Sequence, residues 1–227
     1  QGYSSAASDV YKRQSYYTYN GEKKEIISTQ FESHFAREAF PCVDEPEAKA
    51  TFDLSLKFDA EEGDTALSNM PEINSHLREE TGVWTFETTP RMSTYLLAFG
   101  FGALHGKTAK TKNGTEVGVF ATVAQAENSF DFALDIAVRV IEFYEDYFQV
   151  KYPIPLSYHL ALPDFSAGAM ENWGLVTYRE VYLLVDENSS AASRQQVALV
   201  VAHELAHQWF GNPVSYTHLR AHETGAY

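Results

Sequence analysis

The chain has 227 residues, of which 44% are hydrophobic and 14% aromatic, so it is long and apolar enough to fold and is not intrinsically disordered. Its formal net charge of −14 argues against binding nucleic acid or an anionic membrane, because both require Lys and Arg to neutralise phosphates. No stretch approaches the about 18 apolar residues of a membrane span, and Cys42, as a single cysteine, cannot form an internal disulfide, which favours a reducing, cytoplasmic location.

The two ends of the chain differ from the rest of the sequence. Residues 1–14 and 213–227 have little apolar periodicity, and we interpret both as non-native tails that take no part in the fold. The second tail contains His218, His222 and Glu223, whose spacing imitates a metal site on a helix. We interpret that resemblance to a metal site as incidental.

Residues 15–106 have the period of two that is typical of strands. The clearest case is Thr51–Phe58, where four apolar residues alternate with polar ones. Shorter runs of the same type are Ala66–Ser68, Gly82–Glu87 and Ser93–Phe99. Turn-rich stretches separate them, so we predict part of an N-terminal domain built as an antiparallel β-sandwich or saddle.

Residues 107–212 mix both periods and are predicted to form a second domain, which makes the chain α+β. We expect 107–114 to be a connector, Ser129 to cap an amphipathic helix that ends at Phe148, and a buried helix to begin near Ser190–Ser193, with Ser193 as its cap, and to end at Gly211. The strands predicted here are Val117–Thr122, Tyr158–Leu162, Leu175–Tyr178 and Val181–Val185.

The buried helix contains the motif His203-Glu204-Leu205-Ala206-His207. A spacing of four puts both imidazoles on one helical face, where they can bind one zinc ion. Glu204 lies close enough to take a proton from a zinc-bound water without binding the metal itself. Three ionisable groups in an apolar helix would be costly without partners, which favours a metal site over two core histidines and a structural glutamate.

A second motif, residues 168–174 (GAMENWG), lies between two predicted strands. Its flanking glycines allow close backbone approach to a ligand, and Glu171 can meet a cation. By itself the segment could equally be an ordinary turn with an exposed glutamate.

GAMEN followed by HELAHQWFGN resembles the aminopeptidase N family of zinc peptidases, the gluzincins. The resemblance extends through Thr29–Glu32 and Ala39–Phe52 and covers nearly all of residues 15–212. It is most similar to the intracellular branch of lactic-acid-type bacteria, followed by the animal puromycin-sensitive branch. The resemblance implies that residues 107–212 begin a thermolysin-like catalytic domain.

The resemblance also implies a role for each motif residue in removing the N-terminal residue of peptides. One Zn²⁺ would be held by His203 and His207, with Glu204 as the general base and then the acid. The free α-ammonium of the peptide would be bound by carboxylates. An internal peptide bond carries no cation that could bind to them. The substrate-binding residues so implied are Glu171, Glu32, Gln30, Gly168, Ala169, Met170 and Asn172.

The pattern of the family is incomplete at the C-terminal side. The third zinc ligand of the family is a glutamate on the next helix, but the matching position holds Ala226, with Glu223 three positions away. Catalytic zinc normally has three protein ligands. We therefore expect a C-terminally truncated chain with little or no turnover, whose alternative role is at most peptide binding.

Three other functions are alternatives to an aminopeptidase. A thermolysin-like endopeptidase would share the zinc motif but has no use for Glu32 and Glu171. A leukotriene-type epoxide hydrolase of the same superfamily typically has Gly at the position of Ala169 and Gln at that of Glu32. Cys42 could be a thiol nucleophile, but we interpret it as inert packing.

Overall fold

The computed structural model describes residues 12–212 and has a mixed α+β structure, as the sequence predicts. The strands are β1 (Lys12–Tyr19), β2 (Glu22–Thr29), β3 (Ser55–Lys57), β4 (Asp64–Ser68), β5 (Val83–Thr85), β6 (Phe99–Lys110), β7 (Glu116–Thr122), β8 (Leu156–Leu162), β9 (Ala169–Met170) and β10 (Leu175–Arg179). The helices are α1 (Ala36–Ala39), α2 (Ser75–Thr81), α3 (Asp131–Phe148) and α4 (Ala191–Phe210), with 3₁₀ turns η1 (Thr94–Leu96), η2 (Glu127–Ser129) and η3 (Glu180–Tyr182).

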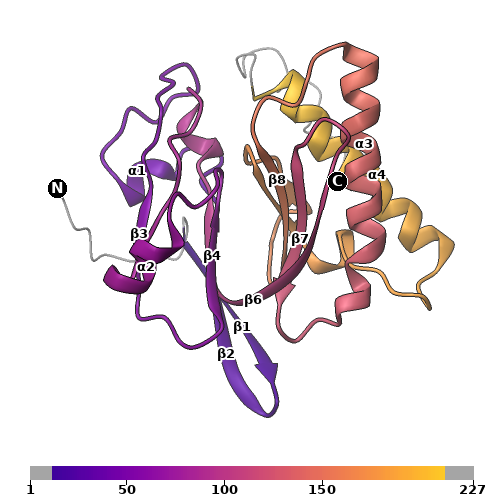
Figure 1. The fold of residues 1–227 in the computed structure, drawn as a ribbon, viewed down its shortest axis with the longest axis horizontal. Helices are drawn as coiled ribbons and strands as arrows, with labels where there is room; N and C mark the ends of the chain where they lie inside the picture. Colours follow the sequence, from indigo (N-terminus) through magenta and orange to yellow (C-terminus); the bar gives the residue numbers. More distant parts are fainter. Residues whose placement is uncertain (1–11, 213–227) are drawn as a thin grey trace.

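One curled sheet of eight strands runs through the described residues, in the order β1-β2-β6-β7-β8-β10-β9, and β4 also pairs with β6. Its N-terminal pairings are antiparallel, whereas β8 runs parallel to both β7 and β10. Figure 1 shows the N-terminal strands on one side, and α3 and α4 together beside β7 and β8. The sandwich and thermolysin-like details of our expectation stay predictions.

The long strand β6 connects the two parts of the chain. Its first half pairs with β2 and β4, and its second half pairs with β7. Gly102 has a φ of +141°, and a Cβ there would lie 2.9 Å from the carbonyl oxygen of Glu25, so only glycine allows this close strand approach. Residues 107–110 continue the strand, so the prediction of a connector is wrong there. The predicted domain boundary after residue 106 falls inside β6.

Helices α3 and α4 cover the second part of the sheet with apolar faces. In α3, Ala133, Ala137 and Ile141 recur at a spacing of four and are fully buried. In α4, Val197 and Val201 are likewise four residues apart and fully buried. The two helices pack against each other, and no helix within residues 12–212 is long and apolar enough to cross a membrane.

Several predicted elements are wrong in detail. The long strand over 51–58 is limited to β3, because its neighbours make only isolated backbone bonds to other segments. Residues 94–96 and 180–182 form 3₁₀ turns instead of strands. Phe130 and not Ser129 precedes α3, and the α4 cap is Ser190, whose hydroxyl accepts from the Ser193 amide at 3.0 Å.

Candidate active site

The helix α4 places His203 and His207 one turn apart, with their rings in contact edge to face. Their Nε2 atoms are 3.2 Å apart and their ring centroids 4.9 Å apart. Two imidazole nitrogens bound to one tetrahedral zinc at about 2.05 Å would be separated by about 3.3 Å. The two donor atoms therefore fit a single zinc ion without rearrangement of the helix.

The protonation state of His207 also fits a metal ligand. Burial, and then the neighbouring His203, lower the pKa of His207 to about 4. The imidazole is therefore neutral at neutral pH and offers a lone pair, which metal binding requires. His203, on the same face, is more exposed.

Glu204 lies on the inner side of the same helix, where it is 3% exposed. Glu171, Glu204 and His207 each offer a ligand atom, and these three atoms lie within 4.8 Å of one another. Two carboxylates and an imidazole so close together can bind a cation, whether a metal ion or an ammonium group. The fold thus brings the two sequence motifs, which are more than 30 residues apart, into one site.

The backbone of Glu171 is attached to the end of α4. Its carbonyl oxygen accepts from Gln208 Nε2 at 3.2 Å and from Asn212 Nδ2 at 3.0 Å. Both donors are almost fully buried, where a hydrogen bond left unmade would be costly. These contacts fix the loop that carries Glu171 relative to the two histidines.

The residues beside Glu171 occupy the edge of the sheet. The strand β9, which contains Ala169 and Met170, pairs with β10 and is the last in the sheet order. The side chains of Met170 and Asn172 are 1% exposed, and Asn172 Nδ2 donates to Thr177 Oγ1 at 3.2 Å. Both residues therefore lie almost entirely beneath the surface beside Glu171.

Two sequence profiles match the chain: that of the Peptidase M1 N-terminal domain over residues 4–96, and that of the Peptidase family M1 domain over residues 132–220. The chain belongs to the M1 peptidase family. This confirms the resemblance recognised from its motifs. The site described above lies within the second match.

This M1 chain is also similar to curated proteins of bacteria and animals. It is 98% identical over 202 residues to the aminopeptidase N of Lactococcus lactis subsp. lactis, which covers 88% of this chain and 24% of that protein. It is 61% identical over 202 residues to the aminopeptidase N of Lactobacillus helveticus, with the same coverage. A puromycin-sensitive aminopeptidase of Caenorhabditis elegans is 50% identical over 206 residues, or 89% of this chain and 21% of that protein. The M1 chain thus spans about a quarter of the length of these relatives.

The other predicted ammonium-binding residues come from the N-terminal part of the M1 chain. Gln30 and Glu32 directly follow β2, and both are partly buried. Gln30 Oε1 is buried and has no hydrogen-bond partner among residues 12–212. Buried carbonyl oxygens of this kind are usually satisfied by a ligand or a water. The roles of Gln30 and Glu32 in binding an ammonium group stay predictions. His218, His222 and Glu223, whose spacing imitates a metal site, lie outside the described residues, as does Ala226.

Four buried polar residues of this part of the fold were not predicted from the sequence: Gln208 and Asn212, which bind the Glu171 carbonyl, and the contacting pair His159 and Tyr178. Gln208 lies four residues after Glu204 on α4, and this spacing could have revealed it, whereas Asn212 follows the end of the helix and has no such signal. His159 and Tyr178 lie on strands, and their contact depends on the pairing of β8 with β10. Strand pairing of that kind is not readable from local patterns.

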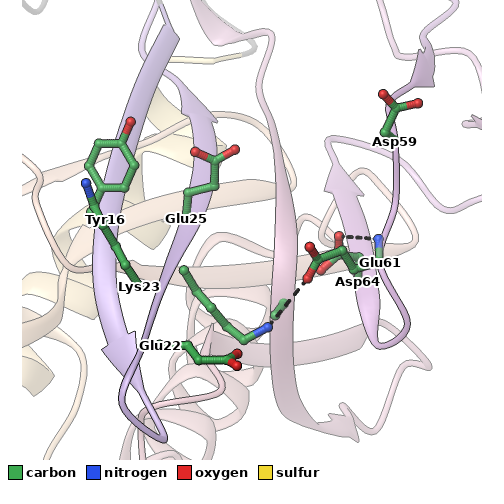
Figure 2. Close-up of a pocket in the computed structure, with 9 residues that line it drawn as sticks. Tyr16, Glu22, Lys23, Glu25, Asp59, Glu61 and Asp64 are labelled. Carbon is green, nitrogen blue, oxygen red and sulfur yellow. Dashed lines mark hydrogen bonds and ion pairs between the residues drawn. The ribbon is translucent and has the colours of Figure 1, made fainter.

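A separate pocket of about 330 Å³ lies between the β1–β2 hairpin and the segment before β4. In Figure 2, Lys23 lies against Tyr16 on the hairpin side of the pocket, and Glu61 and Asp64 lie together on the other side. Lys24 Nζ lies 3.6 Å from Glu61, so part of this acidic lining is paired. The pocket contains none of the motif residues and is not part of the candidate site.

Proposed function

We propose that this M1 chain carries the metal-binding and N-terminus-binding parts of a zinc aminopeptidase that removes the first residue of peptides. The observation that carries the proposal is the cluster of Glu171, Glu204 and His207 within 4.8 Å. His203 Nε2 lies 3.2 Å from His207 Nε2, so a metal site and a cation site share this cluster. The aminopeptidase names of the relatives support the same conclusion.

His203 and His207 would hold one Zn²⁺. Bound zinc would supply Lewis acidity, which polarises the scissile carbonyl and makes water acidic enough to react at neutral pH. Glu204 would take the proton of that water and pass it to the leaving amine, first as a base and then as an acid. Its buried position beside the two imidazoles keeps the carboxylate within reach of the reacting atoms.

Glu171 and Glu32 would bind the α-ammonium of the substrate, and Gln30 would assist them. An ammonium between two carboxylates defines the chain end, because an internal peptide bond is uncharged. The edge strand β9 offers the backbone of Gly168 and Ala169 to an extended peptide. Met170 and Asn172, which flank Glu171, would complete the substrate-binding set. A cytoplasmic location, consistent with a free Cys42 thiol, belongs to the same proposal.

The proposed ammonium-binding carboxylates, Glu171 and Glu32, argue against the alternative functions. A thermolysin-like endopeptidase gains nothing from Glu171 beside Glu204, because its substrates bring no cation to that position. An epoxide hydrolase is disfavoured by Ala169 and Glu32. An incomplete chain that only binds peptides keeps the same recognition chemistry, so binding and turnover are measured separately.

The first experiment measures binding by the chain itself. We expect the zinc-loaded chain to bind leucine amide, which has a free α-ammonium, at least about tenfold more tightly than N-acetyl-leucine amide, since one charge-assisted contact contributes about this much. Glu171→Gln should remove the difference. Equal affinities of the wild-type chain for the two amides would refute exopeptidase recognition.

The second experiment measures metal binding and turnover. Calorimetric titration of the metal-free chain with zinc should give one site, which His207→Ala removes. Hydrolysis of leucine p-nitroanilide is then compared between the chain and the longer Lactococcus lactis relative. We expect turnover in the relative and little or none in the chain, and an N-acetylated peptide should not be cleaved by either protein. Robust turnover by the chain would show that the incomplete-fragment alternative is wrong.

A further inference from the structure

The end of the loop that carries Glu171 is held by a residue from the first half of the chain. Asn69, which directly follows β4, donates from Nδ2 to the carbonyl oxygen of Trp173 at 2.7 Å, across 104 positions of sequence. Asn69 is 1% exposed. A hydrogen bond at so buried a position is costly to leave unmade, so Asn69 fixes the backbone two residues after Glu171.

The side-chain amide of Asn69 has two further partners, both in the segment that leads into β6. Its Nδ2 also donates to the carbonyl oxygen of Leu96 at 2.8 Å, and its Oδ1 accepts from the amide of Ala98 at 2.9 Å. An asparagine amide has two protons and one acceptor oxygen, so the three contacts use both protons. The reversed amide would turn its oxygen towards two carbonyl oxygens, and its orientation is therefore fixed by its partners. Asn69 thus joins Trp173 to residues 96–98.

Gly174 shows how closely the loop approaches Asn69. Its φ is +85°, and a Cβ there would lie 2.1 Å from the carbonyl oxygen of Asn69. Any larger residue would therefore separate the loop from Asn69. The carbonyl oxygen of Gly174 also accepts from the amide of Tyr158 at 2.8 Å, which ties the same point to β8. The backbone of Asn69 thus packs against the end of the loop, in addition to its side chain.

The segment that Asn69 binds also holds the residues before Glu32. Thr29, the last residue of β2, accepts with Oγ1 from the amide of Phe99 at 3.0 Å and donates to the Phe99 carbonyl oxygen at 3.3 Å. Thr29 is 1% exposed, and Gln30 and Glu32 follow it closely in the chain. Residues 96–99 are therefore a common backbone support for both loops that carry a proposed ammonium-binding glutamate.

This support complements the one from the end of α4. Gln208 and Asn212 fix Glu171 relative to the two histidines, because they donate from the same helix or from directly after it. Asn69 fixes Glu171 relative to the Glu32 side. Two carboxylates share one ammonium group only if both stay within hydrogen-bonding distance of it, about 2.7–2.9 Å, so the fold has to hold their separation.

We propose that Asn69 is a positioning residue, which holds the Glu171 loop and the Glu32 loop on one backbone segment at the separation that an ammonium group requires. The ammonium-binding roles of the two glutamates rest on the proposed function, whereas the link between Asn69 and the loop does not. Loss of the link should weaken recognition of a free N-terminus and leave zinc binding unchanged, because both histidines lie on α4.

The first test compares leucine amide with N-acetyl-leucine amide on the zinc-loaded, full 227-residue chain. The wild type should prefer the free amine at least about tenfold, and Asn69→Leu, which keeps the size of the side chain but none of its hydrogen bonds, should reduce this preference to about twofold. The zinc affinity of Asn69→Leu should stay within about twofold of the wild type. A residue that only stabilised the fold would change the free energy of unfolding but not the preference of the folded chain.

Ser68→Ala is the matched control for Asn69→Leu. Ser68 is 2% exposed and donates to the Ala98 carbonyl oxygen at 2.8 Å, so the variant loses a buried hydrogen bond to the same segment but none to the loop. We expect Ser68→Ala to keep the preference of the wild type for the free amine.

A second variant reaches the same link from the loop. Gly174→Ala places a methyl group against the Asn69 carbonyl oxygen and should lower the preference to a similar extent. Gly21→Ala is its matched control, because Gly21 has a similar φ of +82° but nothing within 4 Å of an added Cβ, which reproduces the backbone strain without the clash. If Asn69→Leu does not fold, Gly174→Ala carries the test. A preference as large as that of the wild type in either folded variant would overturn the proposal.

Hydrogen–deuterium exchange tests the link without any substrate. In Asn69→Leu and Gly174→Ala, exchange over residues 168–175 should be about tenfold faster than in the wild type, beyond any change in the whole protein. In Ser68→Ala and Gly21→Ala, exchange in this segment should change only as much as in the whole protein. The side-chain amide protons of Asn69 should themselves be protected in the wild type, and their rapid exchange would overturn the proposal without any variant.

The two measurements together keep this inference distinct from the proposed function. If the wild type binds both amides equally but the exchange results are as expected, the link between Asn69 and the loop stands and the aminopeptidase proposal fails. If the wild type prefers the free amine but Asn69→Leu and Gly174→Ala exchange like their controls, the aminopeptidase proposal stands and this inference is wrong.

Discussion

The two glutamates proposed to bind the substrate ammonium are held in different ways. Glu171 is fixed by polar contacts, since buried side chains of α4 donate to its carbonyl oxygen. Glu32 follows Phe31, which is 1% exposed and packs edge-on against Phe40 with ring centroids 6.1 Å apart. Hydrogen bonds to the backbone therefore hold the Glu171 side, and on the Glu32 side the buried Phe31 ring adds hydrophobic packing, which tolerates small shifts in position.

The largest expected effect comes from removing the packing on the Glu32 side. Phe31→Ala should lower the free energy of unfolding by about 3–5 kcal/mol, because it leaves a cavity in the core. Urea unfolding followed by tryptophan fluorescence measures it. Val43→Ala, at a position 68% exposed, is the control and should change stability by no more than about 0.5 kcal/mol. A loss below about 1 kcal/mol for Phe31→Ala would mean that Glu32 is anchored by something else.

The hydrogen-bonded side should be the more sensitive to acid. The pKa of His159 is lowered to about 3 in the folded chain, whereas an unfolded histidine titrates near about 6.5. The unfolded state therefore binds more protons below pH 6.5, and stability falls by about 1.4 kcal/mol for each pH unit until the folded pKa is reached. Between pH 6.5 and 4.5 this amounts to roughly 2 kcal/mol from His159 alone, because the unfolded histidine is only half protonated at the upper end of the range.

Urea unfolding at several pH values measures this acid effect. His159→Leu should have a shallower slope than the wild type over the same range, because the difference between the two chains isolates one histidine. Identical slopes would place a proton on His159 already in the folded state and would contradict the lowered pKa of this residue.

A smaller effect is expected when the support of Glu171 is removed directly. Gln208→Leu leaves the Glu171 carbonyl with Asn212 as a donor and should lower stability by about 1–2 kcal/mol. Gln196→Leu, on an exposed position of the same helix, is the matched control and should lie within about 0.5 kcal/mol of the wild type. If both variants behave alike in thermal unfolding, the Gln208 contact adds no stability.

The sequence predicted those features that depend on local spacing. The amphipathic stripe of α3 and the two histidines one turn apart were readable because a helix places residues four apart on one face. The sequence did not reveal that the strand predicted over residues 51–58 pairs as a strand only over Ser55–Lys57, or that His159 meets Tyr178. Both outcomes depend on which strands become neighbours, and that is decided by contacts between distant segments.

The N-terminal cap of α4 shows the same limit of prediction from sequence. Ser190 and Ser193 are both suitable caps, and their hydroxyl oxygens lie 2.9 Å apart at the start of α4. The choice between them depends on the direction from which the chain enters the helix, which Asp186 and Arg194 help to set through a bond at 2.6 Å. A pattern of residue types contains no such direction.

The strand β6 has a consequence for how this protein could be divided. Because one continuous strand pairs with β2 and β4 at its start and with β7 further on, a cut after residue 106 would break it within its ladder with β7. Neither half would then be an independent module that could be exchanged between related enzymes. Recombination among relatives should therefore succeed at the turn before β7 rather than at the change in sequence character.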